Sequence, residues 1–120
     1  DLEKPMQIST RESYGVTIVD LEGRLDTSSS GETSDELVRI VKEGRTQLLL
    51  NLERVEYVSS AGLRAILVAA KLIQTARGEM RICRPNKNVR EVMEVSGFDS
   101  LLRLHETETD ALSKFLQAGS

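Results

Sequence analysis

The chain has 120 residues, which is the size of one domain that can bury a hydrophobic core without disulfide bonds. Its 16 Lys and Arg residues against 19 Asp and Glu residues give a net charge of −3, and the scattered basic residues argue against a nucleic-acid partner. No apolar run is long enough to span a membrane and no signal-peptide pattern opens the chain, so a cytoplasmic location without membrane contact is expected.

Strands and helices are predicted to alternate along the chain, as in an α/β fold. Two apolar and β-branched runs, residues 6–12 and 16–22, predict a β-hairpin. Hydroxyl side chains cluster at residues 27–30, and because they favour N-cap positions they predict the start of a helix that ends at Gly44. The first turn of this helix is expected to hold three acidic residues, Glu32, Asp35 and Glu36.

The nearly continuous apolar run at residues 47–52 predicts a central strand that is covered on both faces, followed by a loop at 54–58. The rest of the chain is predicted to form a helix, a strand, a short helix, an edge strand and a terminal helix, at residues 61–76, 80–84, 88–96, 101–105 and 110–117. The single cysteine, Cys83, lies in the strand predicted at residues 80–84 and is expected to be a buried, reduced core residue.

The helix predicted over residues 61–76 has apolar residues on two sides. One side is expected to pack on the sheet and contains Leu63, Ile66, Leu67, Ala70 and Ile73. A second apolar line contains Ala61, Ala65, Val68 and Leu72, with Arg64 and Lys71 on its flank. Either another helix of the domain covers this line, or it is a docking surface for a partner. The position beside Ser60 slightly favours docking.

Ser59 and Ser60 stand at the start of this helix. One of the two is expected to be the N-cap residue, and a cap needs only one hydroxyl. The other is left at a helix N-terminus after a buried strand, where functional groups gather in open α/β folds. A phosphate there would add roughly −1.5 to −2 charges, which the helix dipole tolerates and an acidic partner surface does not.

The run Tyr57-Val58-Ser59-Ser60-Ala61-Gly62-Leu63-Arg64 resembles the STAS domain family, specifically the bacterial anti-sigma factor antagonists. Three further segments match the family in the right order and spacing: Gly23-Arg24-Leu25-Asp26, residues 48–52, and Val95-Ser96-Gly97-Phe98. The resemblance implies one STAS domain over residues 1–120, with a mixed, mostly parallel sheet of four to five strands and about four helices on and around one face. Residues 1–5 and 118–120 are expected to be flexible.

The resemblance also implies partner switching. An unphosphorylated antagonist binds an anti-sigma factor that is also a serine kinase of the histidine-kinase-like ATPase fold, and a PP2C-type phosphatase reverses the modification. Alignment on Gly62 places the modified serine at Ser60. Ser59, which stands where the best-known members carry Asp, is the fallback. The implied partner-binding residues are Asp26, Ser59, Ser60, Ala61, Arg64, Ala65, Val68 and Leu72. A monomer or weak dimer is expected.

Two other functions remain open. One is a STAS module that serves as an accessory or regulatory part of a transport system or of a larger signalling protein. The other is a small hydrolase, which the sequence disfavours, because nothing directs the only histidine, His105, towards Ser60. No catalytic residue, cofactor or metal site is expected, since metal-ligating side chains do not cluster and no glycine-rich phosphate loop is present.

Overall fold

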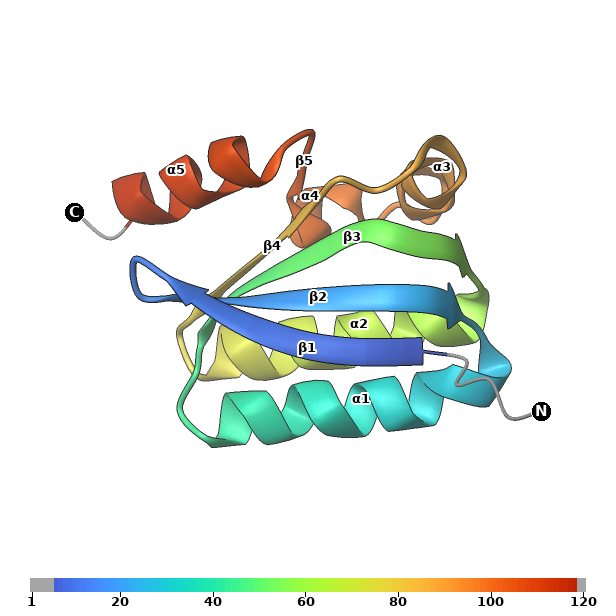
Figure 1. The fold of residues 1–120 in the computed structure, drawn as a ribbon, viewed down its shortest axis with the longest axis horizontal. Helices are drawn as coiled ribbons and strands as arrows, with labels where there is room; N and C mark the ends of the chain where they lie inside the picture. Colours follow the sequence, from blue (N-terminus) through green and yellow to red (C-terminus); the bar gives the residue numbers. More distant parts are fainter. Residues whose placement is uncertain (1–5, 119–120) are drawn as a thin grey trace.

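The computed structural model describes residues 6–118, which form one five-stranded sheet with helices against it (Figure 1). The strands are β1 (Met6–Ser13), β2 (Val16–Leu25), β3 (Gln47–Val58), β4 (Glu79–Cys83) and β5 (Leu104–His105). The helices are α1 (Thr27–Lys42), α2 (Ser60–Thr75), α3 (Lys87–Val95), the four-residue α4 (Asp99–Leu102) and α5 (Glu108–Ala118). The strands follow chain order in the sheet. Only β1 and β2 pair antiparallel, which confirms the predicted mixed, mostly parallel α/β fold.

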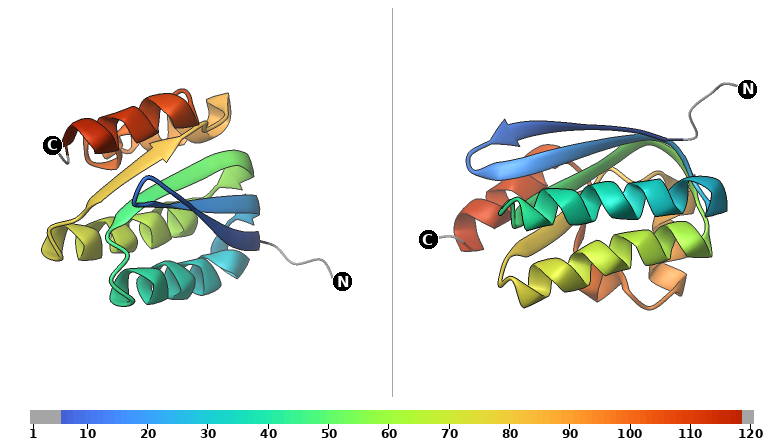
Figure 2. Two further views of the ribbon diagram at one scale, coloured as in Figure 1. Left: turned by 60° about the vertical axis from the view of Figure 1, so that its left-hand side comes forward. Right: turned by 90° about the horizontal axis from the view of Figure 1, so that it is seen from below.

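The two faces of the sheet are covered unequally. α1 and α2 lie side by side on one face (Figure 2), above a large core that includes Leu21, Leu50 and Ile66. A smaller cluster on the other face joins Ile18 and Cys83 to residues of α5. This placement of α5 is a difference from the expected arrangement of helices around one face. It arises because the central strands carry apolar side chains on both faces, as in buried parallel strands.

Several predicted boundaries are wrong. The expected loop at residues 54–58 is part of β3, because β2 continues to pair with this segment across two register shifts, as far as Val58. The N-cap of α1 is Asp26, so the hydroxyl cluster at 27–30 forms the first turn and the acidic residues fall in later turns. The capping box of Asp26 with Ser29 fixes this start, since each side chain bonds to the backbone of the other residue.

The C-terminal part also differs from the prediction. Residues 101–102 belong to α4, and the last strand is the two-residue β5, since the buried Leu102 joins the core as a helical residue. α5 runs to Ala118, the first residue of the segment that was expected to be flexible. Residues 1–5 and 119–120 lie outside the described residues. Between residues 6 and 118, none of the helices combines the length and the apolar character that a membrane crossing requires.

The start of α2 packs directly against the end of β2. The amide of Ser59 donates to the carbonyl oxygen of Leu25, with 2.9 Å between the two atoms. A Cβ atom at position 62 would overlap that same carbonyl and would lie 2.7 Å from Cγ of Leu25. Only glycine therefore allows the helix to approach the strand this closely, which gives the glycine of the Ser-Ala-Gly run a steric role.

We expect Gly62→Ala to lower the free energy of unfolding by about 3 kcal/mol or more, because the added methyl group must push the helix away from the strand. Gly31→Ala is the matched control. Gly31 is an exposed glycine inside α1 with no atom within 4 Å of an added Cβ, so alanine should stabilise the helix there by up to about 1 kcal/mol. Urea denaturation measures both changes, and equal stability of Gly62→Ala and the wild type would contradict the proposed contact.

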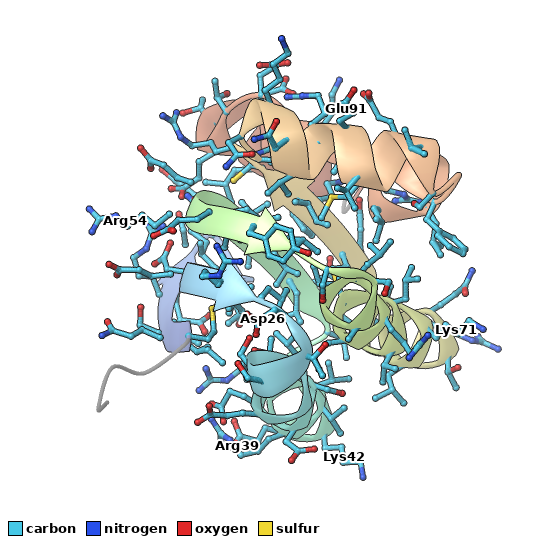
Figure 3. All side chains as sticks on the ribbon, turned by 90° about the vertical axis from the view of Figure 1, so that its right-hand side faces the viewer. Asp26, Arg39, Lys42, Arg54, Lys71 and Glu91 are labelled. Carbon is cyan, nitrogen blue, oxygen red and sulfur yellow. The ribbon has the colours of Figure 1, made fainter. Side chains whose placement is uncertain are left out.

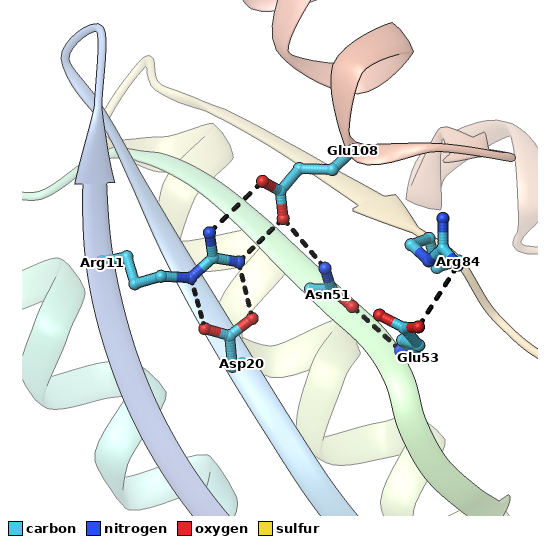
Figure 4. Close-up of polar contacts among 6 residues, drawn as sticks. All are labelled: Arg11, Asp20, Asn51, Glu53, Arg84 and Glu108. Atoms are coloured by element: carbon cyan, nitrogen blue, oxygen red, sulfur yellow. Dashed lines mark hydrogen bonds and ion pairs between the residues drawn. The ribbon is translucent and has the colours of Figure 1, made fainter.

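A polar cluster fixes the first residue of α5 over the sheet (Figure 4). Arg11 of β1 bonds to Asp20 of β2 at 2.7 Å and to Glu108 of α5 at 2.8 Å. Asn51 of β3 donates to the same Glu108 carboxylate at 2.9 Å. Chiefly because Arg11 donates to it, the pKa of the Glu108 carboxyl lies below its ordinary value of 4.5. We call these four residues the α5 clasp, since they tie three strands to one helix.

A carboxyl whose pKa is lowered by folding stabilises the protein above its unfolded pKa and loses that contribution as the pH falls through its folded pKa. We therefore expect Glu108→Gln to lower the free energy of unfolding by about 1 kcal/mol at neutral pH. The difference from the wild type should shrink as the pH falls below about 4.5. Glu106→Gln is the control, since its side chain is 81% exposed and forms a surface ion pair with Arg90, so little change is expected. A constant difference across the pH range would contradict the clasp.

Candidate functional site

The starts of α1 and α2 meet at the carboxyl edge of the sheet, which Figure 3 shows face on. α1 follows β2 and α2 follows β3, and these two strands are parallel neighbours, so both helices begin at the same edge. The bond from Ser59 to Leu25 brings the cap of α2 within one residue of Asp26, the cap of α1. The edge therefore joins two of the sequence segments that predicted a site, Gly23 to Asp26 and Tyr57 to Arg64.

The two serines at the head of α2 have different environments. Ser59 is the N-cap residue, and its hydroxyl oxygen accepts from the amide of Gly62 at 3.1 Å. Ser60 is the first residue of the helix, and its side chain is exposed. Among residues 6–118, no hydrogen bond of the Ser60 hydroxyl is found. The prediction that one serine caps the helix is confirmed. The free hydroxyl belongs to Ser60.

Asp26 contributes a negative charge at the same edge. Its carboxylate accepts from the backbone amide of Ser28 at 3.0 Å and from the hydroxyl of Ser28 at 2.8 Å. The second of these bonds is the main reason why the pKa of Asp26 lies below its ordinary value. The carboxyl is therefore ionised at neutral pH, close to the position where a modified Ser60 would add further negative charge.

The second apolar line of α2 is only partly exposed. Ala65 is 4% exposed and lies in the interior, so the expectation that it lines an open surface is wrong. Its burial follows from the position of α2, which packs against α1 as well as against the sheet. Ala61 and Leu72 are half-buried, while Val68 and Arg64 are exposed. What remains is a narrow strip of α2 that leads away from Ser60.

One feature of this edge was missed by sequence reasoning. The guanidinium carbon of Arg24 lies 4.6 Å from the centroid of the Tyr57 ring, a cation–π geometry. The two residues are partners in the pairing of β2 with β3. Because the sequence prediction placed residues 54–58 in a loop, it had no register that could bring Tyr57 next to Arg24.

The other residues that could carry chemistry lie away from this edge. Cys83 is buried, and desolvation raises the pKa of its thiol to about 12, so it is a thiol at neutral pH. His105 Nε2 accepts from Arg81 at 3.0 Å, since a guanidinium can only donate, and His105 Nδ1 faces Asp110 at 2.8 Å. Within the described part of the chain, no group of three or more potential metal ligands is found.

Comparison with known proteins identifies the family. The STAS domain model matches residues 7–111. The chain belongs to the STAS domain family. A relative named as a candidate anti-sigma factor antagonist, BtrV of Bordetella bronchiseptica, is 33% identical over 113 residues, which cover 94% of this chain and 97% of the relative. The anti-sigma F factor antagonist of Paenibacillus polymyxa is 29% identical over 110 residues, covering 91% and 94% of the two chains.

The fold agrees with this assignment. The crystal structure of a candidate anti-sigma factor antagonist from Thermotoga maritima superimposes with a TM-score of 0.86 at 19% identity, covering 90% of this chain and 93% of that chain. At this identity the likeness shows the fold alone. The relatives in sequence place this STAS domain among the anti-sigma factor antagonists, as the resemblance in its sequence implied.

The geometry separates the cap from the free hydroxyl, and matched variants test that separation. We expect Ser59→Ala to lower the free energy of unfolding of the STAS domain by about 1 kcal/mol, because the amide of Gly62 loses its acceptor. Ser60→Ala should change it by no more than about 0.5 kcal/mol, since an exposed hydroxyl is removed. Urea denaturation at neutral pH measures both variants. A larger loss for Ser60→Ala than for Ser59→Ala would reverse the assignment of the cap.

Proposed function

We propose that this STAS domain binds an anti-sigma factor and that phosphorylation of Ser60 releases the partner. Relatives that match nearly their whole length carry the name anti-sigma factor antagonist, which supports the class of partner. The observation that carries the site is the exposed hydroxyl of Ser60 beside a capping Ser59. A kinase can modify this hydroxyl without removing the cap of α2.

The charge of a phosphate gives the switch its physical basis. A phosphoserine carries roughly −1.5 to −2 charges at neutral pH, and the N-terminus of a helix accommodates negative charge. The fold of the domain is therefore preserved. The ionised carboxyl of Asp26 lies at the same edge, so phosphate and carboxylate together make it strongly negative. A partner surface that tolerates the edge before modification is repelled after it.

The proposed contact surface starts at this edge and follows α2. It contains the accessible or half-buried members of the predicted set: Asp26, Ser59, Ser60, Ala61, Arg64, Val68 and Leu72. Ala65 supports the helix from inside and is left out. The partner is an anti-sigma factor with serine kinase activity and a histidine-kinase-like ATPase fold, and a PP2C-type phosphatase restores binding. In this role the domain is a binding protein without catalytic activity of its own.

Ser60 is favoured over Ser59 as the modified residue on structural grounds. The oxygen of Ser59 accepts from the amide of Gly62, so its modification would disturb the cap. Ser59 also holds the position where the best-known family members carry Asp. Both residue types are good N-caps, so the exchange keeps the start of the helix while it removes one negative charge beside Ser60.

The test combines modification with binding. The wild type, incubated with its cognate kinase and ATP, should gain one phosphate by mass spectrometry, while Ser60→Ala should gain none. Ser60→Asp should weaken binding to the anti-sigma factor about tenfold or more by isothermal titration calorimetry, with the melting temperature retained.

Thr109→Asp provides the control for added charge. Thr109 is an exposed residue in the first turn of α5, so this variant gains the same charge at another helix start and should bind like the wild type. Phosphate on Ser60→Ala at Ser59 would assign the role to the fallback residue. Equal binding by Ser60→Asp and the wild type would argue against the switch.

A further inference from the structure

Arg24 and Tyr57 form an exposed, ordered pair beside the start of α2. The Arg24 guanidinium lies 4.6 Å from the centroid of the Tyr57 ring, and Tyr57 keeps 42% of its surface exposed. The side chain of Arg24 is 55% exposed. Both side chains are therefore partly accessible to a partner, and tyrosine and arginine are enriched at the energetic centres of protein interfaces.

The backbone holds this pair in place. The pairing of β2 with β3 shifts register between Gly23 and Arg24, and after the shift Arg24 pairs with Tyr57. Such irregularities re-aim side chains near functional sites. The next pair along, Leu25 with Val58, is buried in the core, so the two strands place alternate pairs inside and outside. The stacked pair is therefore fixed by the same strand ends that position Ser59 and Ser60.

Within residues 6–118, no hydrogen bond donated by the Arg24 guanidinium is found. Its central carbon lies over the ring, and its Nε forms an ion pair with the carboxylate of Asp26 at 3.8 Å, which is longer than a hydrogen bond. A guanidinium carries five N–H donors around its edge. Stacking on the ring leaves that edge open while it restricts the motion of the side chain. This is the geometry that binds a carboxylate through two parallel hydrogen bonds.

We propose that the Arg24–Tyr57 pair is the anchor of the partner interface and binds an acidic side chain of the anti-sigma factor. The proposal rests on the proposed function and adds the group on which recognition depends. The ring orders the guanidinium before the partner arrives, which reduces the entropy lost on binding. The guanidinium recognises a carboxylate, and the exposed part of the Tyr57 ring provides apolar contact area around that ion pair.

The anchor also explains why Ser60 can control binding. Tyr57 lies three residues before Ser60 in the chain, and the carbonyl that bonds to Ser59 belongs to Leu25, the neighbour of Arg24. A phosphate on Ser60 places a second anion near the position that the partner's carboxylate must occupy. Like charges at one site repel, so the modification weakens the anchor directly.

The experiment measures binding of the unphosphorylated full chain to the purified anti-sigma factor by isothermal titration calorimetry. We expect Arg24→Ala and Tyr57→Ala each to raise Kd by about 10-fold to 50-fold. Arg24→Lys should raise Kd by about fivefold or more, because an ammonium keeps the charge but lacks the planar fork. Tyr57→Phe should stay within about twofold of the wild type, since it retains the ring.

Two controls match the size and charge of these changes at the far end of the domain. Arg45→Ala removes an exposed arginine after α1, and Tyr14→Ala removes a 79% exposed tyrosine from the β1–β2 turn. Both should bind like the wild type. The melting temperature of each variant is measured to check that it is folded. If an alanine variant unfolds, the two single variants Arg24→Lys and Tyr57→Phe still allow the comparison.

A double variant tests whether the two residues act as one unit. Each alanine removes the contact between guanidinium and ring. The Kd of the double variant Arg24→Ala/Tyr57→Ala should therefore be little higher than that of the weaker-binding single variant. The anchor is overturned if the wild type binds and its Kd stays within twofold in all three variants Arg24→Ala, Arg24→Lys and Tyr57→Ala. That result would leave the proposed function standing. No binding of the wild type to the anti-sigma factor would overturn both.

Discussion

The contact between the carbonyl of Leu25 and the start of α2 is the constraint on which the edge of the domain depends. The same carbonyl oxygen accepts a hydrogen bond from the amide of Ser59 and occupies the space that a Cβ atom at position 62 would need. The end of one strand is thereby locked to the start of a helix that follows another strand. The caps of α1 and α2 become neighbours, although Asp26 and Ser59 are far apart in the sequence.

This lock divides the work between two adjacent serines. The hydroxyl of Ser59 caps α2, whereas the hydroxyl of Ser60 is exposed and takes no part in the cap. A covalent group on a residue that also capped the helix would change fold and surface together. With the duties separated, a phosphate changes the charge of the edge alone. The same edge carries Asp26, Arg24 and Tyr57, so charge, donor groups and apolar area meet where modification would occur.

The opposite face of the sheet is held in a different way. There α5 covers only a small apolar cluster, and much of its attachment comes from polar groups. These are the α5 clasp at its first residue and the bond of Asp110 to His105 in the same helical turn. The α1 and α2 face is fixed by a large core, whereas the α5 face depends on ionised groups. The attachment of α5 should therefore be the more sensitive to acid, since protonation of Glu108 weakens the bonds that hold this helix on the sheet.

The sequence by itself determined the alternating α/β order, the central apolar strand, the helix after Ser59-Ser60 and the family, because apolar periodicity, caps and a short glycine-containing motif are local signals. It did not determine features set by neighbours distant in the chain. Residues 54–58 alternate the charged Arg54 and Glu56 with valine and tyrosine, and they form a strand because β2 continues to pair with them. Ala65 fits an exposed apolar line on a helix drawn alone, yet it is buried because α2 packs beside α1. The stacking of Arg24 on Tyr57 depends on the register of two strands after an irregularity, and only the tertiary structure decides such a register.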